Sequence, residues 1–574
     1  MTAGDDRRAP ASEFALALLL ALVERGVTDL VVSPGSRSQA LALAAAELER
    51  AGRIRLHVRV DERDAGFLAL GMGLATGRPA PVVTTSGSAV ANLMPAALEA
   101  ARDRTPMLLL TADRPSWLRG TGANQTTDQA GLLGDRAVLN LDVAPVTDAD
   151  AAVAAAAAVA LEALPVALEA RALRRGPAQI DLQFTEPLSG PHTPIEALLP
   201  RVRRALAAGR APLDVAPPAA VLGGPVTVDA ASTLVLAGQG ADADLVRRAA
   251  ERGCAVIAEI TSGLRRWQSE LPGGYRAWLD AGAPGVRTVV ATGLPTLSRQ
   301  ARQVALRPDL RLVTRAPLPG ECFDPGHRTE RVAEVRITGR GPWTPGGRAE
   351  DAPASAAGAP IHPDDPADTA DATAPSAPRP TAPTSCMPPA DARGAVVDAV
   401  WAASGPADAV YLASSTMVRV ADERVDPGRG GVPVLAHRGL AGIDGTVSAA
   451  SGVALARVAR HPDAVTRLVI GDLALAHDVG GLLVPPVEAR PPLQIVVVDD
   501  RGGSIFAGLE VAQADPALYD RVVRTPQRYE LTALARAYGW GHVRAHDPAE
   551  LAAALATRRP LIVEVRVDDV GGWA

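Results

Sequence analysis

Carboxylates follow two short apolar runs in the last third of the chain. The run Leu468–Ile470 is followed, after one glycine, by Asp472. The run Ile495–Val498 leads directly into Asp499 and Asp500, and a Gly-Gly turn comes two residues later. Ligands of open α/β sheets bind beyond the carboxyl ends of strands, and carboxylate oxygens together with phosphates hold Mg²⁺. The pattern therefore predicts a site for a hard divalent cation at two neighbouring strand ends.

Both acidic segments also have a purely structural interpretation. Asp472 could cap the helix that follows it, and Asp-Asp-Arg-Gly-Gly could be a plain turn, because Asp and Gly are common in both places. The pairing favours the metal site: Gly-Asp ends one predicted strand, and Asp-Asp-x-Gly-Gly ends another 28 residues later.

A third acid, Glu62, lies just past a predicted strand at 54–60, where a helix begins. The helix dipole favours an acid there, so a capping role is the alternative. Asp61 can already cap this helix. A second acid at the carboxyl edge of a sheet is therefore placed for work on a ligand.

Arginines stand at or near other predicted strand ends. They are Arg37, Arg419 and Arg438, with Arg299 in a turn-rich stretch. Guanidinium groups bind carboxylates through two parallel hydrogen bonds. Most of the 58 basic residues must be solvated surface groups, but several arginines that converge on one cleft would suit a substrate with several carboxylates.

Composition excludes several classes of function. The net charge of −6 argues against non-specific nucleic-acid binding. All the basic residues are arginine, so a Schiff-base lysine and a P-loop lysine are excluded. The three cysteines are far apart, which indicates neither a zinc site nor a disulfide framework. Because the start lacks signal-peptide order and the apolar run 14–23 is too short for a bilayer, we expect a cytoplasmic protein without membrane contact.

Alternating strand and helix patterns predict an α/β protein with three units. Strands are expected at 29–32, 54–60, 81–85, 107–111, 179–184, 232–237, 255–259, 288–291, 310–313, 409–412, 432–436, 468–470, 495–498 and 561–567. The expected organisation is a first domain (1–189), a linker rich in Pro and Ala (190–227), a central α/β domain (228–343), a disordered Pro/Ala-rich linker (344–390) and a last domain (391–574). The second linker has almost no aliphatic residues and cannot offset its ordering entropy by burial.

Six motifs, in this order, resemble those of the 2-succinyl-5-enolpyruvyl-6-hydroxy-3-cyclohexene-1-carboxylate synthase family, the thiamine-diphosphate enzymes of menaquinone biosynthesis. They are Ser33–Ser38, Asp61–Gly71, Thr111–Pro115, Gly122–Gln125, His437–Gly445 and Gly471-Asp472. The resemblance spans nearly the whole chain apart from 344–390.

The resemblance implies three doubly wound parallel-sheet domains of the thiamine-diphosphate-enzyme type. The first would bind the pyrimidine ring, and the last would bind the diphosphate and Mg²⁺ or Mn²⁺. It implies a homo-oligomer, a dimer or a dimer of dimers, with active sites between the first domain of one subunit and the last domain of another. The implied reaction is decarboxylation of 2-oxoglutarate and 1,4-addition of the resulting carbanion to isochorismate.

The resemblance also implies roles for single residues. Glu62 would be catalytic, through a hydrogen bond to the aminopyrimidine ring. Asp472, Asp500 and the carbonyl of Gly502 would hold the metal, with Ser415 and Ile443 beside the coenzyme. The implied substrate-binding residues are Ser36, Arg37, Asn124, Gln125, Arg299, Arg419, Arg438, Ile505 and Phe506.

The chain departs from the family pattern at two places. Asp499-Asp500-Arg501 stands where an Asn-rich triplet is usual, which keeps an oxygen ligand at 500 but adds negative charge. Ser298-Arg299 stands where the family often has Lys-Arg.

Two other functions are compatible with parts of the pattern. Another 2-oxoacid decarboxylase or an acetolactate-type synthase would share the metal motif and the glutamate, but not Arg37 or the His437-Arg438-Gly439 motif. A non-catalytic paralogue would bind coenzyme without turnover, and the presence of both Glu62 and Asp472 argues against it.

Overall fold

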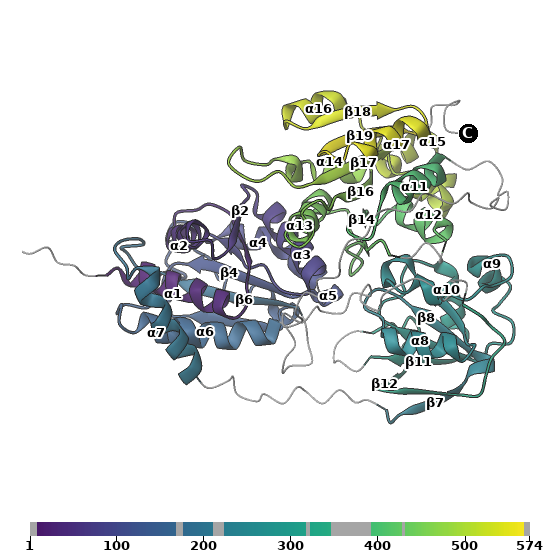
Figure 1. The fold of residues 1–574 in the computed structure, drawn as a ribbon, viewed down its shortest axis with the longest axis horizontal. Coiled ribbons are helices and arrows are strands. Elements are labelled where there is room, and N and C mark those ends of the chain that lie inside the picture. Colours follow the sequence, from purple (N-terminus) through teal and green to yellow (C-terminus); the bar gives the residue numbers. More distant parts are fainter. Residues whose placement is uncertain are drawn as a thin grey trace, which may run out of the picture.

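Three α/β domains, each built on a parallel sheet, make up the computed structural model (Figure 1). The structure describes residues 8–167, 176–209, 223–316, 322–345, 392–426 and 431–567. The predicted fold class is confirmed. None of the helices in these ranges has the length and apolar character that a membrane crossing requires. The second expected linker, apart from Thr344 and Pro345, lies outside the described residues.

The first domain has a six-stranded parallel sheet with the order β2-β1-β3-β4-β6-β5. Its strands are β1 (Asp29–Val32), β2 (Arg55–Val58), β3 (Val82–Thr84), β4 (Met107–Asp113), β5 (Leu139–Val143) and β6 (Pro177–Gln183). Its helices are α1 (Pro10–Glu24), α2 (Gln39–Arg50), α3 (Glu62–Thr76), α4 (Ser88–Asn92), α5 (Met94–Asp103), α6 (Ala152–Ala167) and α7 (Ile195–Ala208). The strand β5 was not predicted, because it is a half-exposed edge strand with a weak apolar signal.

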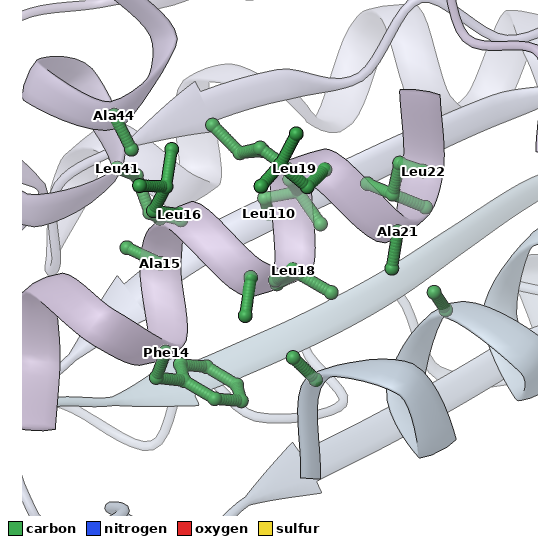
Figure 2. Close-up of a cluster of buried hydrophobic side chains, with 14 of the residues drawn as sticks. Phe14, Ala15, Leu16, Leu18, Leu19, Ala21, Leu22, Leu41, Ala44 and Leu110 are labelled. Carbon is green, nitrogen blue, oxygen red and sulfur yellow. The ribbon is translucent and has the colours of Figure 1, made fainter. Parts of the chain in front are cut away.

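Helix α1 is apolar on nearly all sides, as expected for a helix surrounded by protein. Figure 2 shows its residues Leu16 and Leu19 among side chains that include Leu41 of α2 and Leu110 of β4. The ring of Phe14 meets that of Phe184 edge-on, with centroids 6.2 Å apart. The run that is too short to cross a bilayer is thus the centre of the first domain's core.

The expected linker at 190–227 is wrong in part, because α7 forms within it. Ile195, Leu198, Leu199 and Val202 recur at helical spacing and are buried in the core of the first domain. Pro and Ala dominated the composition of the segment and hid this periodicity. The strand β7 also begins inside the expected linker, at Val226.

The central domain has a five-stranded parallel sheet, β12-β11-β10-β8-β9, and a separate pair, β13-β7. Its strands are β7 (Val226–Asp229), β8 (Thr233–Ala237), β9 (Ala255–Ala258), β10 (Thr288–Thr292), β11 (Arg311–Arg315), β12 (Glu330–Val332) and β13 (Val335–Thr338). Its helices are α8 (Ala243–Glu251), α9 (Tyr275–Asp280) and α10 (Arg299–Leu306).

The last domain has a six-stranded parallel sheet with the order β15-β14-β16-β17-β19-β18. Its strands are β14 (Ala409–Leu412), β15 (Val434–Leu435), β16 (Thr466–Gly471), β17 (Leu493–Asp499), β18 (Gly541–Ala545) and β19 (Leu561–Arg566). Its helices are α11 (Ala392–Ala403), α12 (Thr416–Arg424), α13 (Thr446–Val458), α14 (Asp472–His477), α15 (Pro516–Tyr519), α16 (Leu531–Ala537) and α17 (Pro548–Ala556).

The first and last domains are joined by direct packing of α3 against α13 (Figure 1). A Cβ atom on Gly71 would lie 1.9 Å from the carbonyl oxygen of Ala449, and one on Gly452 would lie 2.1 Å from that of Leu68. Glycine therefore lets the two helix backbones touch. One continuous apolar cluster contains buried residues of both domains. This packing fixes the first and last domains relative to each other.

Candidate active site

The carboxyl ends of β16 and β17 lie side by side. The strands pair in parallel with Gly471 opposite Val498, so Asp472 and Asp499 emerge from neighbouring strand ends. Asp472 is the first residue of α14 and is only 5% exposed, and Asp500 is half-buried. The structure thus places the two carboxylates proposed as metal ligands at one edge of the sheet.

Negative charge accumulates at this edge. Burial, and next the nearby carboxylates of Asp500 and Asp499, raise the pKa of Asp472 to about 6. The backbone N–H groups of Leu473 and Gly502 donate to the Asp472 carboxylate and oppose this shift. A cation between the acids would relieve their repulsion.

Asp500 has a cationic partner that we did not predict. Arg393 Nη2, near the start of α11, lies 2.8 Å from Asp500 Oδ2, and the hydroxyl of Ser504 donates to the same oxygen. The guanidinium compensates the negative charge that Asp500 adds relative to the usual asparagine. This pair offers a physical reason why the chain can carry an acid at 500.

The segment after β17 is a tight turn. Arg501 has a φ of 58°, and its backbone N–H donates to Asp499 Oδ1 at 3.0 Å. Gly502 has a φ of 124°, and a Cβ atom there would lie 2.4 Å from the carbonyl oxygen of Arg524. The turn interpretation is therefore correct for this segment. The capping interpretation of Asp472 is wrong, since Gly471 is the N-cap of α14.

The donor set suits a hard cation. Within the described ranges, no group of three or more His, Cys, Asp or Glu side chains could hold a metal. The proposed set needs only two carboxylates, Asp472 and Asp500, and the carbonyl of Gly502, which here accepts a hydrogen bond from Ser504 N at 2.9 Å. Mg²⁺ often takes one or two carboxylates and fills its octahedron with phosphate oxygens and water. The residues present fit a metal diphosphate.

Ser415 is the N-cap of α12, and Ile443 lies three residues before the start of α13. Ser415 precedes α12, and its carbonyl accepts a 2.7 Å hydrogen bond from Arg419 Nη1. Ile443 lies near the start of α13, partly buried against the cluster that the first and last domains share. Both residues therefore lie in segments whose position is fixed by packing.

Glu62 is free of the capping role. The side chain of Asp61 caps α3 by accepting from Arg63 N at 2.8 Å and Asp64 N at 3.4 Å. Glu62 is half-buried, and Asn92 Nδ2 donates to its Oε2 at 3.0 Å. The start of α3 thus presents an oriented carboxylate that helix formation does not require.

Two buried carboxylates meet where α3 reaches the last domain. Asp64 and Asp478 are 3% and 0% exposed and hydrogen-bond each other. Burial, and next the charge of Asp61, raise the pKa of Asp64 to about 6. Burial, and next the charge of Asp64, raise the pKa of Asp478 well above its usual range. Such a pair holds a proton in the folded state.

We expect the Asp64→Asn variant to gain stability over the wild type as the pH rises. A carboxyl whose pKa is raised by folding stabilises the folded state at low pH and loses that contribution as the pH rises through the folded value. The variant cannot ionise at this position. Its free energy of unfolding should improve relative to the wild type by about 1–3 kcal/mol between roughly pH 4.5 and pH 7.5. Urea unfolding at both pH values checks this, and parallel pH profiles would contradict it.

Arginines converge on a second region, which residues of all three domains line. A cavity of about 430 Å³ is lined by Arg102, Arg299, Arg302 and Arg419, with Asp324 as its acid. Burial, and next the charge of the nearby Arg438, lower the pKa of Arg419. Three of the arginines predicted from strand ends and turns, Arg299, Arg419 and Arg438, are therefore close neighbours.

Arg438 has unsatisfied hydrogen-bonding capacity. The residue is 3% exposed, and its Nη2 donates to Thr296 Oγ1 at 3.1 Å. Among the described residues, its Nε and Nη1 are buried without a hydrogen-bond partner. Burial lowers the pKa of Arg438, while the carboxylate of Glu259 opposes that shift. Unpaired buried N–H groups are costly, so this arrangement favours an anionic ligand.

The first domain contributes a separate polar group. Arg37 Nη1 donates to the carbonyl of Phe184 at 3.0 Å, and Gln125 Nε2 donates to that of Ser86 at 2.9 Å. Arg114 joins them, since its Nη1 donates to the carbonyl of Gln125 at 2.7 Å and its charge helps to lower the pKa of Arg37 after burial. Two further proposed substrate residues, Ser36 and Asn124, are exposed beside this group.

Ile505 and Phe506 lie in the turn that follows Gly503. Ile505 is half-buried, whereas Phe506 is 39% exposed. The ring of Phe506 folds over Gly503, where a Cβ atom would lie 2.9 Å from Phe506 Cδ2. These apolar side chains are next to the proposed metal carboxylates in sequence and partly open to solvent.

The predicted site residues thus form two sets. Glu62, Arg37 and Gln125 belong to the first domain, and the metal carboxylates and Arg438 belong to the last. In the part of the chain that the structure describes, no hydrogen bond or ion pair links the residues of one set to those of the other.

Three arginines near these groups were not selected as site residues from the sequence, although Arg114 lies within the Thr111–Pro115 motif. Arg114 directly follows β4. Selecting arginines at strand ends, as was done for Arg37, would therefore have identified it. Arg393 lies next to the predicted disordered segment, far from any predicted strand end, and carried no signal. Arg102 is near the end of α5, and only tertiary packing brings it to the cavity.

Comparison with known families identifies two regions of the chain. The model for the thiamine pyrophosphate enzyme N-terminal TPP binding domain matches residues 13–132. The model for the C-terminal TPP binding domain of the same enzymes matches residues 430–565. These regions contain Glu62 and the Asp472–Gly502 segment, respectively.

Curated relatives match over nearly the full length. A 2-succinyl-5-enolpyruvyl-6-hydroxy-3-cyclohexene-1-carboxylate synthase from Clavibacter michiganensis subsp. michiganensis (strain NCPPB 382) is 43% identical, with 97% of this chain and 96% of its own covered. A relative of the same name from Leifsonia xyli subsp. xyli (strain CTCB07) is 43% identical, with 95% and 94% covered. A solved benzoylformate decarboxylase from Polynucleobacter necessarius covers 97% of this chain and 98% of its own with a TM-score of 0.61. It is 14% identical, so it is similar in fold alone.

Proposed function

Because this chain belongs to the 2-succinyl-5-enolpyruvyl-6-hydroxy-3-cyclohexene-1-carboxylate synthase family of thiamine pyrophosphate enzymes, we propose that the two sets of residues described above are the halves of its active site. The protein is a thiamine-diphosphate-dependent carboligase of menaquinone biosynthesis. It decarboxylates 2-oxoglutarate and joins the remainder to isochorismate by 1,4-addition. The proposal concerns which residues do this work.

The metal site rests on one observation, the adjacency of Asp472 and Asp500 at paired strand ends. We propose that both carboxylates and the carbonyl of Gly502 hold Mg²⁺ or Mn²⁺, which in turn holds the diphosphate. Ser415 and Ile443 would contact the coenzyme from the starts of α12 and α13.

Glu62 is proposed as the catalytic carboxyl. Thiamine diphosphate, when bound, supplies the nucleophilic carbon at which a 2-oxo acid loses CO₂. Glu62 would hold a proton at a ring nitrogen of the aminopyrimidine, and Asn92 would keep the carboxylate oriented through its 3.0 Å hydrogen bond. A half-buried carboxyl at a helix start can move that proton in either direction.

The arginines would bind the carboxylates of the two substrates. Arg438 has two buried N–H groups to offer, and Arg419 and Arg299 line the adjoining cavity. Arg37, with Ser36, Asn124 and Gln125, would bind from the first domain. Ile505 and Phe506 would cover the apolar part of the substrates. A guanidinium group can bind a carboxylate through two parallel hydrogen bonds. Several arginines therefore support substrates with two carboxylates over pyruvate, which has one.

We propose a homo-oligomer, a dimer or a dimer of dimers, with active sites between subunits. The two sets of proposed site residues lie in two domains, and among the described residues no hydrogen bond or ion pair joins the two sets, which supports this. The first domain of one subunit would then supply Glu62 and Arg37 to the last domain of another.

The proposal is tested by incubating the protein with thiamine diphosphate, Mg²⁺, 2-oxoglutarate and isochorismate while following the loss of isochorismate absorbance. We expect loss only when the coenzyme, the metal and 2-oxoglutarate are all present. Pyruvate serves as the control donor, and an equal rate with pyruvate would favour a general 2-oxoacid decarboxylase or acetolactate-type synthase. Coenzyme binding without turnover would favour a non-catalytic paralogue.

A further inference from the structure

We infer that Glu99 and Asp103, on α5 of the first domain, are positioning residues that fix the loop carrying Arg438 in the last domain. The inference rests on the proposed role of Arg438 in binding substrate carboxylates. It adds two acids from another domain, neither of them within a substrate-binding motif, to the machinery that sets substrate affinity.

Glu99 and Asp103 bind three consecutive backbone amides of this loop. The two carboxylate oxygens of Glu99 accept from Gly439 N at 2.6 Å and from Leu440 N at 2.8 Å. Asp103, one helical turn further along α5, accepts from Arg438 N at 3.2 Å. Glu99 is 3% exposed. The buried carboxylate of Glu99 holds its two backbone N–H groups firmly, because such hydrogen bonds are charge-assisted. Burial, and next the charge of Glu99, raise the pKa of Asp103 well above its usual range, so Asp103 adds a weaker hydrogen bond.

Gly439 lets the loop lie directly on α5. A Cβ atom at this position would lie 2.8 Å from Arg102 Cβ, 2.9 Å from the carbonyl oxygen of Glu99 and 3.0 Å from Asp103 N. The φ of Gly439 is not in the left-handed region, so close approach, and not backbone conformation, is what requires glycine here.

The residue before Arg438 is fixed as well. His437 is 1% exposed, its Nδ1 lies 2.7 Å from the hydroxyl of Tyr411, and its Nε2 lies 3.1 Å from the carbonyl oxygen of Gly442. The hydroxyl of Ser414 donates to the carbonyl of His437 at 2.7 Å. The segment that carries Arg438 is therefore held by its own domain on one side and by α5 on the other.

The acids hold the backbone and leave the guanidinium available. Both carboxylate oxygens of Glu99 accept from the backbone amides of Gly439 and Leu440, and Asp103 accepts from the backbone amide of Arg438. Burial lowers the pKa of Arg438, and the acids that oppose this shift are Glu259 first, followed by Asp103 and Glu99. The Nε and Nη1 atoms remain for a ligand, because no described residue bonds them. A small displacement of a binding group lowers its effectiveness steeply, so the loop position sets affinity.

The test compares Glu99→Gln with Glu13→Gln in the full-length holoenzyme. Glutamine can accept at only one of its two terminal atoms, so it keeps one of the two amide bonds at most. We expect the KM for at least one of the two dicarboxylates to rise about tenfold or more, with kcat changed much less and with affinity for thiamine diphosphate and Mg²⁺ unchanged. Glu13 is the control, because it is also buried in the first domain and accepts from Thr193 N at 2.7 Å and Thr193 Oγ1 at 2.8 Å. It differs from Glu99 in pairing with Arg8 and Arg201, and among the described residues it makes no hydrogen bond to the Arg438 loop.

Three further variants keep the test decisive if Glu99→Gln folds poorly. Gly439→Ala should lift the loop from α5 without removing a carboxylate, and should raise the same KM. Asp103→Asn, which retains an oxygen acceptor, should raise it less than Asp103→Ala. Unchanged KM values in Glu99→Gln and Gly439→Ala, or an equal rise in Glu13→Gln, would overturn the inference. Failure of the proposed function itself is separate, because the wild type would then show no coenzyme-dependent turnover.

Discussion

Replacing Glu62 with glutamine is expected to leave thiamine diphosphate bound but to slow turnover by at least ~10²-fold, the usual scale of lost acid–base assistance. Glutamine keeps the size of the side chain and one acceptor oxygen, and it removes the group that exchanges a proton. Steady-state kcat measured with 2-oxoglutarate and isochorismate, together with coenzyme titration by calorimetry, separates the two effects. Asp61 already caps α3, so helix stability does not require Glu62.

The matched control is Asp61→Asn. It removes one negative charge from the same helix start, and asparagine is as good an N-cap as aspartate. We expect near wild-type turnover from this variant. A Glu62→Gln enzyme with near wild-type kcat would remove Glu62 from the catalytic role, and equal losses in both variants would point to the charge of the helix start.

Replacing Asp472 with alanine is expected to weaken coenzyme binding in Mg²⁺ by ~10²-fold or more. Loss of groups that merely support a metal ligand already costs about 10–100-fold in metal affinity, and Asp472 is proposed as a ligand itself. Burial, and next the charges of Asp500 and Asp499, raise the pKa of Asp472, so a cation bound beside it would relieve the repulsion between these acids. Calorimetric titration of metal-stripped protein with thiamine diphosphate, with and without Mg²⁺, measures the effect.

Asp499→Asn is the matched control for this variant. Asp499 belongs to the same edge of the sheet, but its carboxylate accepts from Arg501 N at 3.0 Å and lies 3.6 Å from Arg566. We expect a much smaller loss of affinity than in Asp472→Ala. Equal losses would mean that the total negative charge of the edge matters, and that Asp472 is not a specific ligand.

The fold could be predicted where strands are buried on both faces. Runs such as Leu468–Ile470 and Ile495–Val498 are continuous and β-branched, which indicates central strands of a parallel sheet, and the fold class is confirmed. Half-exposed edge strands were predicted unevenly: those at Arg55–Val58 and Val434–Leu435 lie within predicted strands, whereas Leu139–Val143 was not predicted. Helix α7 was hidden because its four buried apolar residues are scattered among Pro, Ala and Arg.

The positions of site residues could be predicted as far as strand ends allowed. Asp472 and Asp500 lie together because parallel strands end at a common edge. The pairing of Arg393 with Asp500 could not be predicted, because it joins residues 107 apart in the chain through packing alone. The same holds for Glu99 and Gly439, which are 340 residues apart. Helix-to-loop contacts between domains leave no periodic trace in a sequence.

The most direct test of a shared active site is to combine the two inactive variants. Chains carrying Glu62→Gln and Asp472→Ala, with different affinity tags, are expressed together and the mixed dimer is purified through both tags. If Glu62 of one subunit serves the metal site of the other, one of the two sites in this dimer is intact, and we expect about half of the wild-type activity. Activity no greater than that of either variant alone would show that each site is built within one chain and would contradict the proposed assembly.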